Sequence, residues 1–411
     1  MSTPASLYRN AIDLNRYSKG VARRIITSYN DIIIDAVNQL RTIDELAAPV
    51  KAARLRGILA QLKDSLGTWA GDSTAVTAIE LQGIAQLQSE FVTDQLRRAL
   101  PAGQRNIVNT VEISPQFAQS VVTTDPTQLN VVTLSDDLFA AAYGSPQTYS
   151  LTASQGATIT LPNGQVVEKA FRGIATSQAE QFSQVVRNGL LTGEPTPAIA
   201  KRLIGSLEHS GERLRFGQAA VTEGQRRAAG IKSIMASGGD ATRMANNQVM
   251  ALVRTSINQV ANTASQQVYE ANQDITSKYR YVATLDSRTS SICQALDGQE
   301  FPYGQGPMPP QHFNCRSTTV PVIDYKALGF PPPPEGKRAA AGGMVPAGTT
   351  YGEWLYQQSQ AEQAEILGAG KATYFRRLSQ QHGPQTAIAK LVRDDGSELT
   401  LAQLQKRYGP A

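Results

Sequence analysis

DSRTSSICQALDGQEFPYGQGPMPPQHFNCRSTTVP, residues 286–321, is the stretch from which the fold and chemistry of this chain are best inferred. It holds both cysteines of the 411-residue sequence, Cys293 and Cys315, and one of its three histidines, His312. An Asp-Gly dipeptide typical of a type I′ turn and a Pro-Pro pair lie between them. Scarce reactive side chains and rigid turn residues rarely gather by chance, so the segment predicts a loop whose shape matters.

The spacing of these residues suits a metal ion. One tight turn can present both His312 and Cys315, and Cys293 reaches the same point from the preceding arm of the loop. Zinc binds Cys and His donors at about 2.0–2.3 Å, so these three residues are candidate zinc ligands. Asp286 is the candidate for a fourth ligand, because it enters from the end of a predicted strand and zinc accepts carboxylates. Two lone cysteines also favour a metal or a structural thiol over a disulfide.

Two other interpretations of the loop remain open. In the first, the thiols are small buried apolar groups, His312 bonds a backbone carbonyl, and ion pairs hold the loop. The residues for such pairs are two arginines and two aspartates beside the turn glycine: Arg288, Arg316, Asp286 and Asp297, with Gly298 in the turn. In the second, a thiol and His312 form a catalytic dyad, which requires an activated thiolate, oxyanion donors and a cleft. No Gly-rich nucleophile elbow or other nucleophile signature surrounds Cys293, which disfavours the dyad.

The order D-x-R-T-x(3)-C-x(3)-D-G-x(2)-F, followed by P-P-x-H-x(2)-C-R-S-T-x(2)-P, resembles the signature of the phage Mu protein F family of minor head proteins. Three later segments are similar to the tail that follows this module in many members: residues 351–355, 363–368 and 396–401. Upstream, Arg254-Thr255 also fits, although Ser256 stands where the family more often has Glu. Members often have a cysteine where this chain has Ser290, and serine is a poor zinc ligand.

The resemblance implies a structural virion protein rather than an enzyme. It implies a minor head protein that associates with the portal and with other capsid or scaffold proteins, and that acts in head assembly and in DNA packaging or ejection. Such a protein is assembled in the host cytoplasm and resides near the portal vertex. The alternative is a module of this type that carries an effector or enzymatic activity, but the short polar segment after the four-proline run shows no catalytic signature.

The composition agrees with a helical interaction protein. The chain is 41% hydrophobic and only 6% aromatic, with a net charge of +5 that forms no long basic run. We therefore expect any contact with double-stranded DNA to be electrostatic and non-specific. The sequence shows neither the apolar core of a secretory signal nor an apolar run long enough to span a membrane.

The periodicity predicts a mainly α fold with a small α+β module. Residues 1–105 form an N-terminal helical region, a bundle or arm of three helices with a break at Gly71-Asp72-Ser73. Residues 106–176 are irregular in pattern and contain a predicted β-hairpin at 157–167, around Asn163-Gly164.

The rest of the chain divides into three segments. Residues 177–330 correspond to the head-morphogenesis module, with a helix that starts at the capping box of Ser177. Further predicted elements in it are helices at 195–207, 212–230 and 241–273 and a strand at 279–285 that leads into the Cys/His loop. Residues 331–345 read as a Pro/Gly/Ala linker, and 346–411 as a polar tail with two short helices and an Asp395-Gly396 turn.

Overall fold

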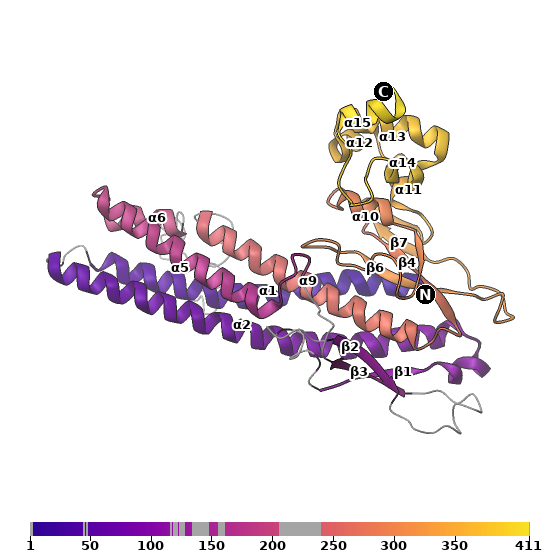
Figure 1. The fold of residues 1–411 in the computed structure, drawn as a ribbon, viewed down its shortest axis with the longest axis horizontal. Coiled ribbons are helices and arrows are strands. Elements are labelled where there is room, and N and C mark those ends of the chain that lie inside the picture. The colour runs from indigo at the N-terminus through magenta and orange to yellow at the C-terminus, as the bar shows by residue number, and fades with distance from the viewer. Residues whose placement is uncertain are drawn as a thin grey trace, which may run out of the picture.

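A computed structural model of the chain describes residues 3–43, 46, 48–115, 117, 122, 128–133, 148–154, 161–204 and 240–410. Long helices lie side by side in an elongated body, and a smaller unit of strands and short helices rises from one end of it (Figure 1). The fold is mainly helical with a small antiparallel sheet module, as predicted.

Four long helices make the body: α1 (Thr3–Arg41), α2 (Ala48–Ala99), α5 (Val167–Leu191) and α9 (Asp240–Glu270). Each has apolar residues at three- and four-residue steps, and one continuous core of buried side chains runs between them. Trp69 of α2 packs at its centre, with ring centroids 5.4 Å from Tyr29 of α1 and 5.8 Å from Phe171 of α5. The indole N–H donates to the Ile25 carbonyl at 3.1 Å.

The break predicted at Gly71-Asp72-Ser73 is wrong, because α2 is one helix of 52 residues. Gly71 and Asp72 are exposed, whereas Ala70 and Ser73 face the core. A glycine costs a helix about 1 kcal/mol relative to alanine, and burial of the apolar face on both sides of it outweighs that cost.

A short three-stranded sheet lies beside the body. After the 3₁₀ helix η1 (Ala102–Ile107), strand β1 (Thr110–Ile113) runs parallel to β3 (Thr148–Ser154), and β2 (Gln128–Thr133) pairs antiparallel with the other edge of β3. Ser89 of α2 donates to the Val111 carbonyl, which ties the sheet to the bundle.

The hairpin predicted at 157–167 falls partly on residues 155–160, outside the described residues. Of the described part, Gly164 N–H donates to the Leu161 carbonyl and adopts φ +76°, so the turn is present. The second strand is wrong: α5 begins at Val167, ten residues before the predicted start at Ser177, because Val167, Phe171 and Ile174 continue its buried face. The next helix, α6 (Thr196–Ile204), agrees with the prediction, and the helix predicted at 212–230 lies outside the described residues.

The sheet module follows α9, as predicted. Strand β4 (Thr276–Val282) is the centre of an antiparallel sheet, with β5 (Glu300–Pro302) on one edge and β6 (Thr318–Ile323) on the other. The short helix α10 (Ser291–Leu296) connects β4 to β5. On β4, Tyr279 and Tyr281 precede and follow Arg280 in the sequence, and both tyrosines are fully buried.

The predicted linker at 331–345 is a folded hairpin from Lys337 onward. Strand β7 (Lys337–Ala340) pairs with β8 (Gly343–Pro346), and Ala341 N–H donates to the Leu285 carbonyl at 2.7 Å. The Ala/Gly-rich composition suggested a linker, but it did not reveal that Arg338 is buried. This side chain is only 5% exposed and donates a hydrogen bond to Asp297, which holds the segment in the folded module.

The C-terminal segment has five short helices where two were predicted: α11 (Tyr351–Tyr356), α12 (Gln360–Leu367), α13 (Ala369–His382), α14 (Pro384–Ala389) and α15 (Leu401–Tyr408). They enclose a core of their own around Trp354 and Phe375 and pack against α10 (Figure 1). The predicted Asp395-Gly396 turn is present, with Gly396 at φ +79°. Within the described ranges, no helix combines the length and apolarity that a bilayer span requires.

Candidate metal centre

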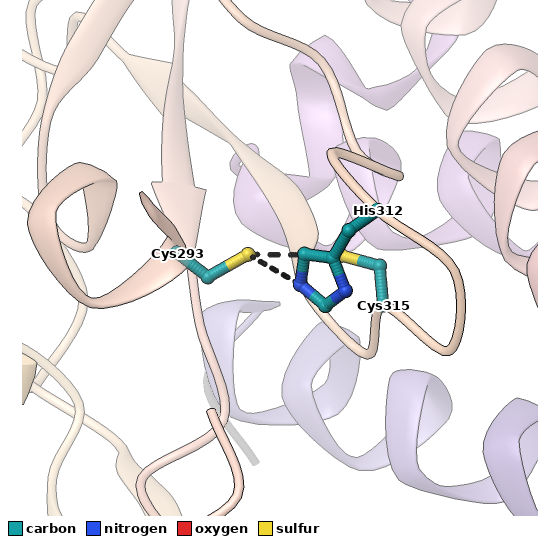
Figure 2. A group of neighbouring side chains, drawn as sticks. All are labelled: Cys293, His312 and Cys315. Atoms are coloured by element: carbon teal, nitrogen blue, oxygen red, sulfur yellow. Dashed lines mark hydrogen bonds between the residues drawn. The ribbon is translucent and has the colours of Figure 1, made fainter. Parts of the chain in front are cut away.

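Three reactive side chains meet beside the end of β4. Cys293 lies on α10, while His312 and Cys315 lie on the loop that precedes β6 (Figure 2). A tight turn brings the latter two to the same side, since Cys315 N–H donates to the His312 carbonyl at 3.1 Å. Asn314 adopts φ 62° within this turn, a conformation that asparagine tolerates better than most residues. The structure thus brings together the three predicted donors.

The donor atoms lie close enough together to bind one metal ion. They all lie within 4.8 Å of one another, with Cys293 Sγ 3.8 Å from Cys315 Sγ and 3.4 Å from His312 Nε2. Zinc with bonds of about 2.3 Å to sulfur and 2.0 Å to nitrogen requires ligand separations of roughly 3.8 Å and 3.6 Å at the tetrahedral angle. The two separations that involve Cys293 are therefore close to those that a bound zinc ion requires.

The His312 ring is held in the orientation that a metal ligand needs. Its Nδ1 lies 2.8 Å from the Phe313 carbonyl oxygen, which can only accept, so Nδ1 carries the proton. Nε2 then presents its lone pair to the thiols, as in metal-binding histidines that donate their other N–H to a carbonyl. Ser290, at the N-cap of α10, lies 2.7 Å from Nε2 and donates its hydroxyl proton there.

The pKa values of the two thiols are shifted in opposite directions by their contact. The pKa of Cys315 is well below its ordinary value, because Cys293 donates a hydrogen bond to it and His312 lies beside it. The pKa of Cys293 is raised by the same hydrogen bond and by burial. The neighbouring Cys315 in turn raises the pKa of His312. A thiolate is the form that binds metal, so the lowered pKa of Cys315 favours its role as a soft ligand.

Asp286, the predicted fourth ligand, lies outside this donor group, and its carboxylate is held by Arg316 instead. Arg316 binds it through two hydrogen bonds of 2.5 and 2.7 Å, and Thr289 Oγ1 donates to the same carboxylate at 3.2 Å. Burial alone would raise the pKa of Asp286, but the hydrogen bonds and charge of Arg316 lower it. Arg288, whose side chain is 79% exposed, lies 3.7 Å away. The predicted Arg–Asp pair therefore exists beside the donor group and independently of it.

Asp297 and Gly298 hold the loop in a way the sequence did not indicate. Asp297 has φ −58° and ψ 128° and Gly298 has φ +82°, which makes the turn type II rather than the predicted type I′. Asp297 binds neither Arg288 nor Arg316. It is fully buried and forms an ion pair with Arg338. No sequence motif identified Arg338, whose one distinguishing feature in the sequence is its charge within an Ala/Gly-rich segment.

The space beside the donors is small. The cavity next to Cys293 and His312 has a volume of about 10 Å³, and the two cysteines are 1% and 0% exposed. A water molecule or an ion fits such a volume, whereas a carbonyl substrate does not. This geometry favours the metal and packing interpretations of the loop over the catalytic dyad.

Fold and site together define a mainly helical protein with a small sheet module built around a Cys/His loop. Residues 180–320 match the model of a family described as phage Mu protein F like protein. This segment of the chain is therefore phage Mu protein F-like, and it contains all three donors. Searches against curated proteins and against solved structures gave no match to the chain.

Proposed function

We propose that the chain is a minor head protein of a bacteriophage, with a structural role in head morphogenesis. The observation that carries the proposal is the match of residues 180–320 to the phage Mu protein F-like family, which spans the folded helix-sheet-loop unit. The extended helical body supports it, because such a body offers long lateral surfaces for assembly. Mass spectrometry of purified particles tests the proposal: the chain should be a low-copy component of the head and absent from tails.

The finer proposal is association with the portal ring, close to the portal vertex, through the helical region. The apolar stripes of α1 and α2 pack inside the bundle, so the surface for a partner lies on their outer faces. On α2, Val76, Ile79 and Leu87 are 37%, 74% and 64% exposed and lie along one side of the helix. Their exposure supports a contact with a capsid, scaffold or portal protein.

Co-purification with the portal tests this surface. The double variant Ile79→Glu/Leu87→Glu should lose the portal, since it places two charges on the proposed contact. Leu191→Glu is the matched control, because Leu191 is 85% exposed on α5, and it should retain the portal. Absence of any complex with the unaltered chain at micromolar concentration would refute portal association.

We propose zinc as the ion of the Cys/His group. The proximity of the three donors and the orientation of His312 support it. The fourth ligand would be the hydroxyl of Ser290, which lies beside His312, or a water molecule. Bound zinc would join α10 to the loop before β6. Elemental analysis of protein purified without chelator should give about one zinc per chain. Cys315→Ser should abolish it, and a metal-free chain that is fully folded would leave only the packing interpretation.

We propose that any contact with packaged DNA is electrostatic and non-specific. The +5 net charge supports weak attraction to phosphates and no base readout. Binding to duplex DNA should therefore collapse between about 50 and 200 mM salt. Salt-insensitive or sequence-selective binding would contradict this proposal.

A further inference from the structure

A second cavity, of about 440 Å³, lies between the first half of α1 and the segment that leads into the Cys/His loop. Its walls are mostly apolar: Ala11 and Ile12 line it from α1, and Leu285 and Ala340 line it from the opposite side. Tyr8 is fixed at its edge, since its hydroxyl donates to the Ala347 carbonyl at 3.2 Å. The cavity shares no donor residue with the candidate metal centre.

Basic side chains surround one end of this cavity. Arg288 and Arg316 line it directly, and Arg316 also lines a smaller cavity together with Arg254 of α9. Arg254 donates through Nη1 to Asn314 Oδ1 at 2.8 Å, while its buried Nε has no hydrogen-bond partner among the described residues. Three segments distant in the sequence thus bring their arginines to one place.

These charges are incompletely neutralised. Asp286 is the one acidic residue among those that line the larger cavity, and it is bound by Arg316. Burial lowers the pKa of Lys19 on α1, and repulsion from Arg254 and Arg288 lowers it further. Within the described ranges, no ion pair joins Lys19 or Arg254 to a carboxylate. An anionic group placed at this end of the cavity would be attracted by Arg288 and Arg316.

We propose that this groove binds an acidic peptide segment of a partner protein, with an apolar side chain in the 440 Å³ cavity and a carboxylate against Arg288 at its basic end. The apolar walls decide between the classes of ligand. A nucleic-acid backbone would satisfy the basic end but has no apolar group to fill the cavity, whereas a peptide that alternates acidic and apolar residues satisfies both parts.

Fluorescence anisotropy with the full-length chain tests the proposal. The probe is a fluorescein-labelled eight-residue peptide of alternating Glu and Leu, compared with the same length of alternating Glu and Gly. The Glu/Leu peptide should bind more tightly than the Glu/Gly peptide. Arg288→Glu should weaken its binding about tenfold, because the charge facing the peptide is reversed. Ile12→Asn should weaken it through loss of the apolar wall.

Arg56→Glu is the matched control. It makes the same charge change at an exposed position of α2, two residues before Ile58, which lines a cavity together with Ala36 of α1. Ala36 lies about 35 Å along α1 from Ile12. Binding of the peptide to this variant should equal that of the unaltered chain. Arg288 is 79% exposed, so its replacement should leave the fold intact, which circular dichroism checks.

A 30-base-pair DNA duplex serves as the competing probe. Peptide binding that is equally weakened by Arg288→Glu and Arg56→Glu would overturn the proposal, as would the absence of peptide binding. A third outcome is that the duplex binds the unaltered chain, that Arg288→Glu weakens this binding, and that the Glu/Leu peptide does not bind. In that case the groove is a nucleic-acid surface and the peptide proposal is wrong.

Discussion

Arg338 and Asp297 form an ion pair that is sealed from solvent, with side chains 5% and 0% exposed and contacts of 3.2 Å from both Nη atoms. Asp297 also accepts hydrogen bonds from the backbone N–H groups of Ala283 at 2.7 Å and Tyr351 at 2.6 Å. One carboxylate therefore joins the end of β4, the turn after α10, β7 and the start of α11. The C-terminal helices are fastened to the Cys/His loop through it.

We predict that Asp297→Asn destabilises the protein by about 3–5 kcal/mol, because it leaves the Arg338 charge buried without its partner. Urea unfolding measures the change. Asp94→Asn is the control, since Asp94 pairs with Arg98 on the surface of α2 and its loss should cost at most about 1 kcal/mol. Equal effects of the two substitutions would show that the buried pair does not hold the loop.

We predict that Asp286→Asn lowers stability but leaves the metal content of the chain unchanged. The structure assigns Asp286 to Arg316 and keeps it out of the donor group, so the substitution removes an ion pair and no ligand. Elemental analysis before and after dialysis against a weak chelator distinguishes the two roles, with Cys315→Ser as the variant that loses metal. Metal loss from Asp286→Asn equal to that from Cys315→Ser would restore the aspartate as a ligand.

We predict that Gly298→Ala is more harmful than Gly329→Ala. Both glycines have positive φ, +82° and +79°, so each substitution incurs a backbone cost of about 1–2 kcal/mol. Only at Gly298 would the added methyl group also meet another side chain, 2.8 Å from Thr350 Cγ2 at the start of α11. Thermal unfolding of the two variants gives the comparison, and equal losses would mean that α11 does not press on this turn.

The donor group of the site was predictable from the sequence, and its surroundings were not. Spacing placed His312 and Cys315 on one turn, and the two-residue linker between them leaves little freedom. The partner of Asp297, by contrast, is 41 residues away in the sequence. No local pattern distinguishes Arg338 from Arg316 as that partner, because the choice depends on how the β7–β8 hairpin packs.

The presence of the helices was predictable from the sequence, but the residues at which some of them begin were not. Ser177 and Glu180 have the spacing of a capping box, yet they lie inside α5, where Gln178 accepts a hydrogen bond from the buried Tyr29 at 2.8 Å. A local capping signal contributes about 1 kcal/mol. Burial of Phe171 and Ile174, earlier in the same helix, contributes more and extends it toward the N-terminus.

The same competition between local signals and packing yields a test in α2. We predict that Gly71→Ala stabilises the protein by about 0.5–1 kcal/mol, because Gly71 is an exposed helical residue. An added methyl group there meets nothing within 4 Å. Gly67→Ala, one turn earlier and equally unobstructed, should give the same gain in urea unfolding. If Gly67→Ala stabilises and Gly71→Ala destabilises, residue 71 needs a conformation that alanine resists, and the interruption predicted from the sequence exists after all.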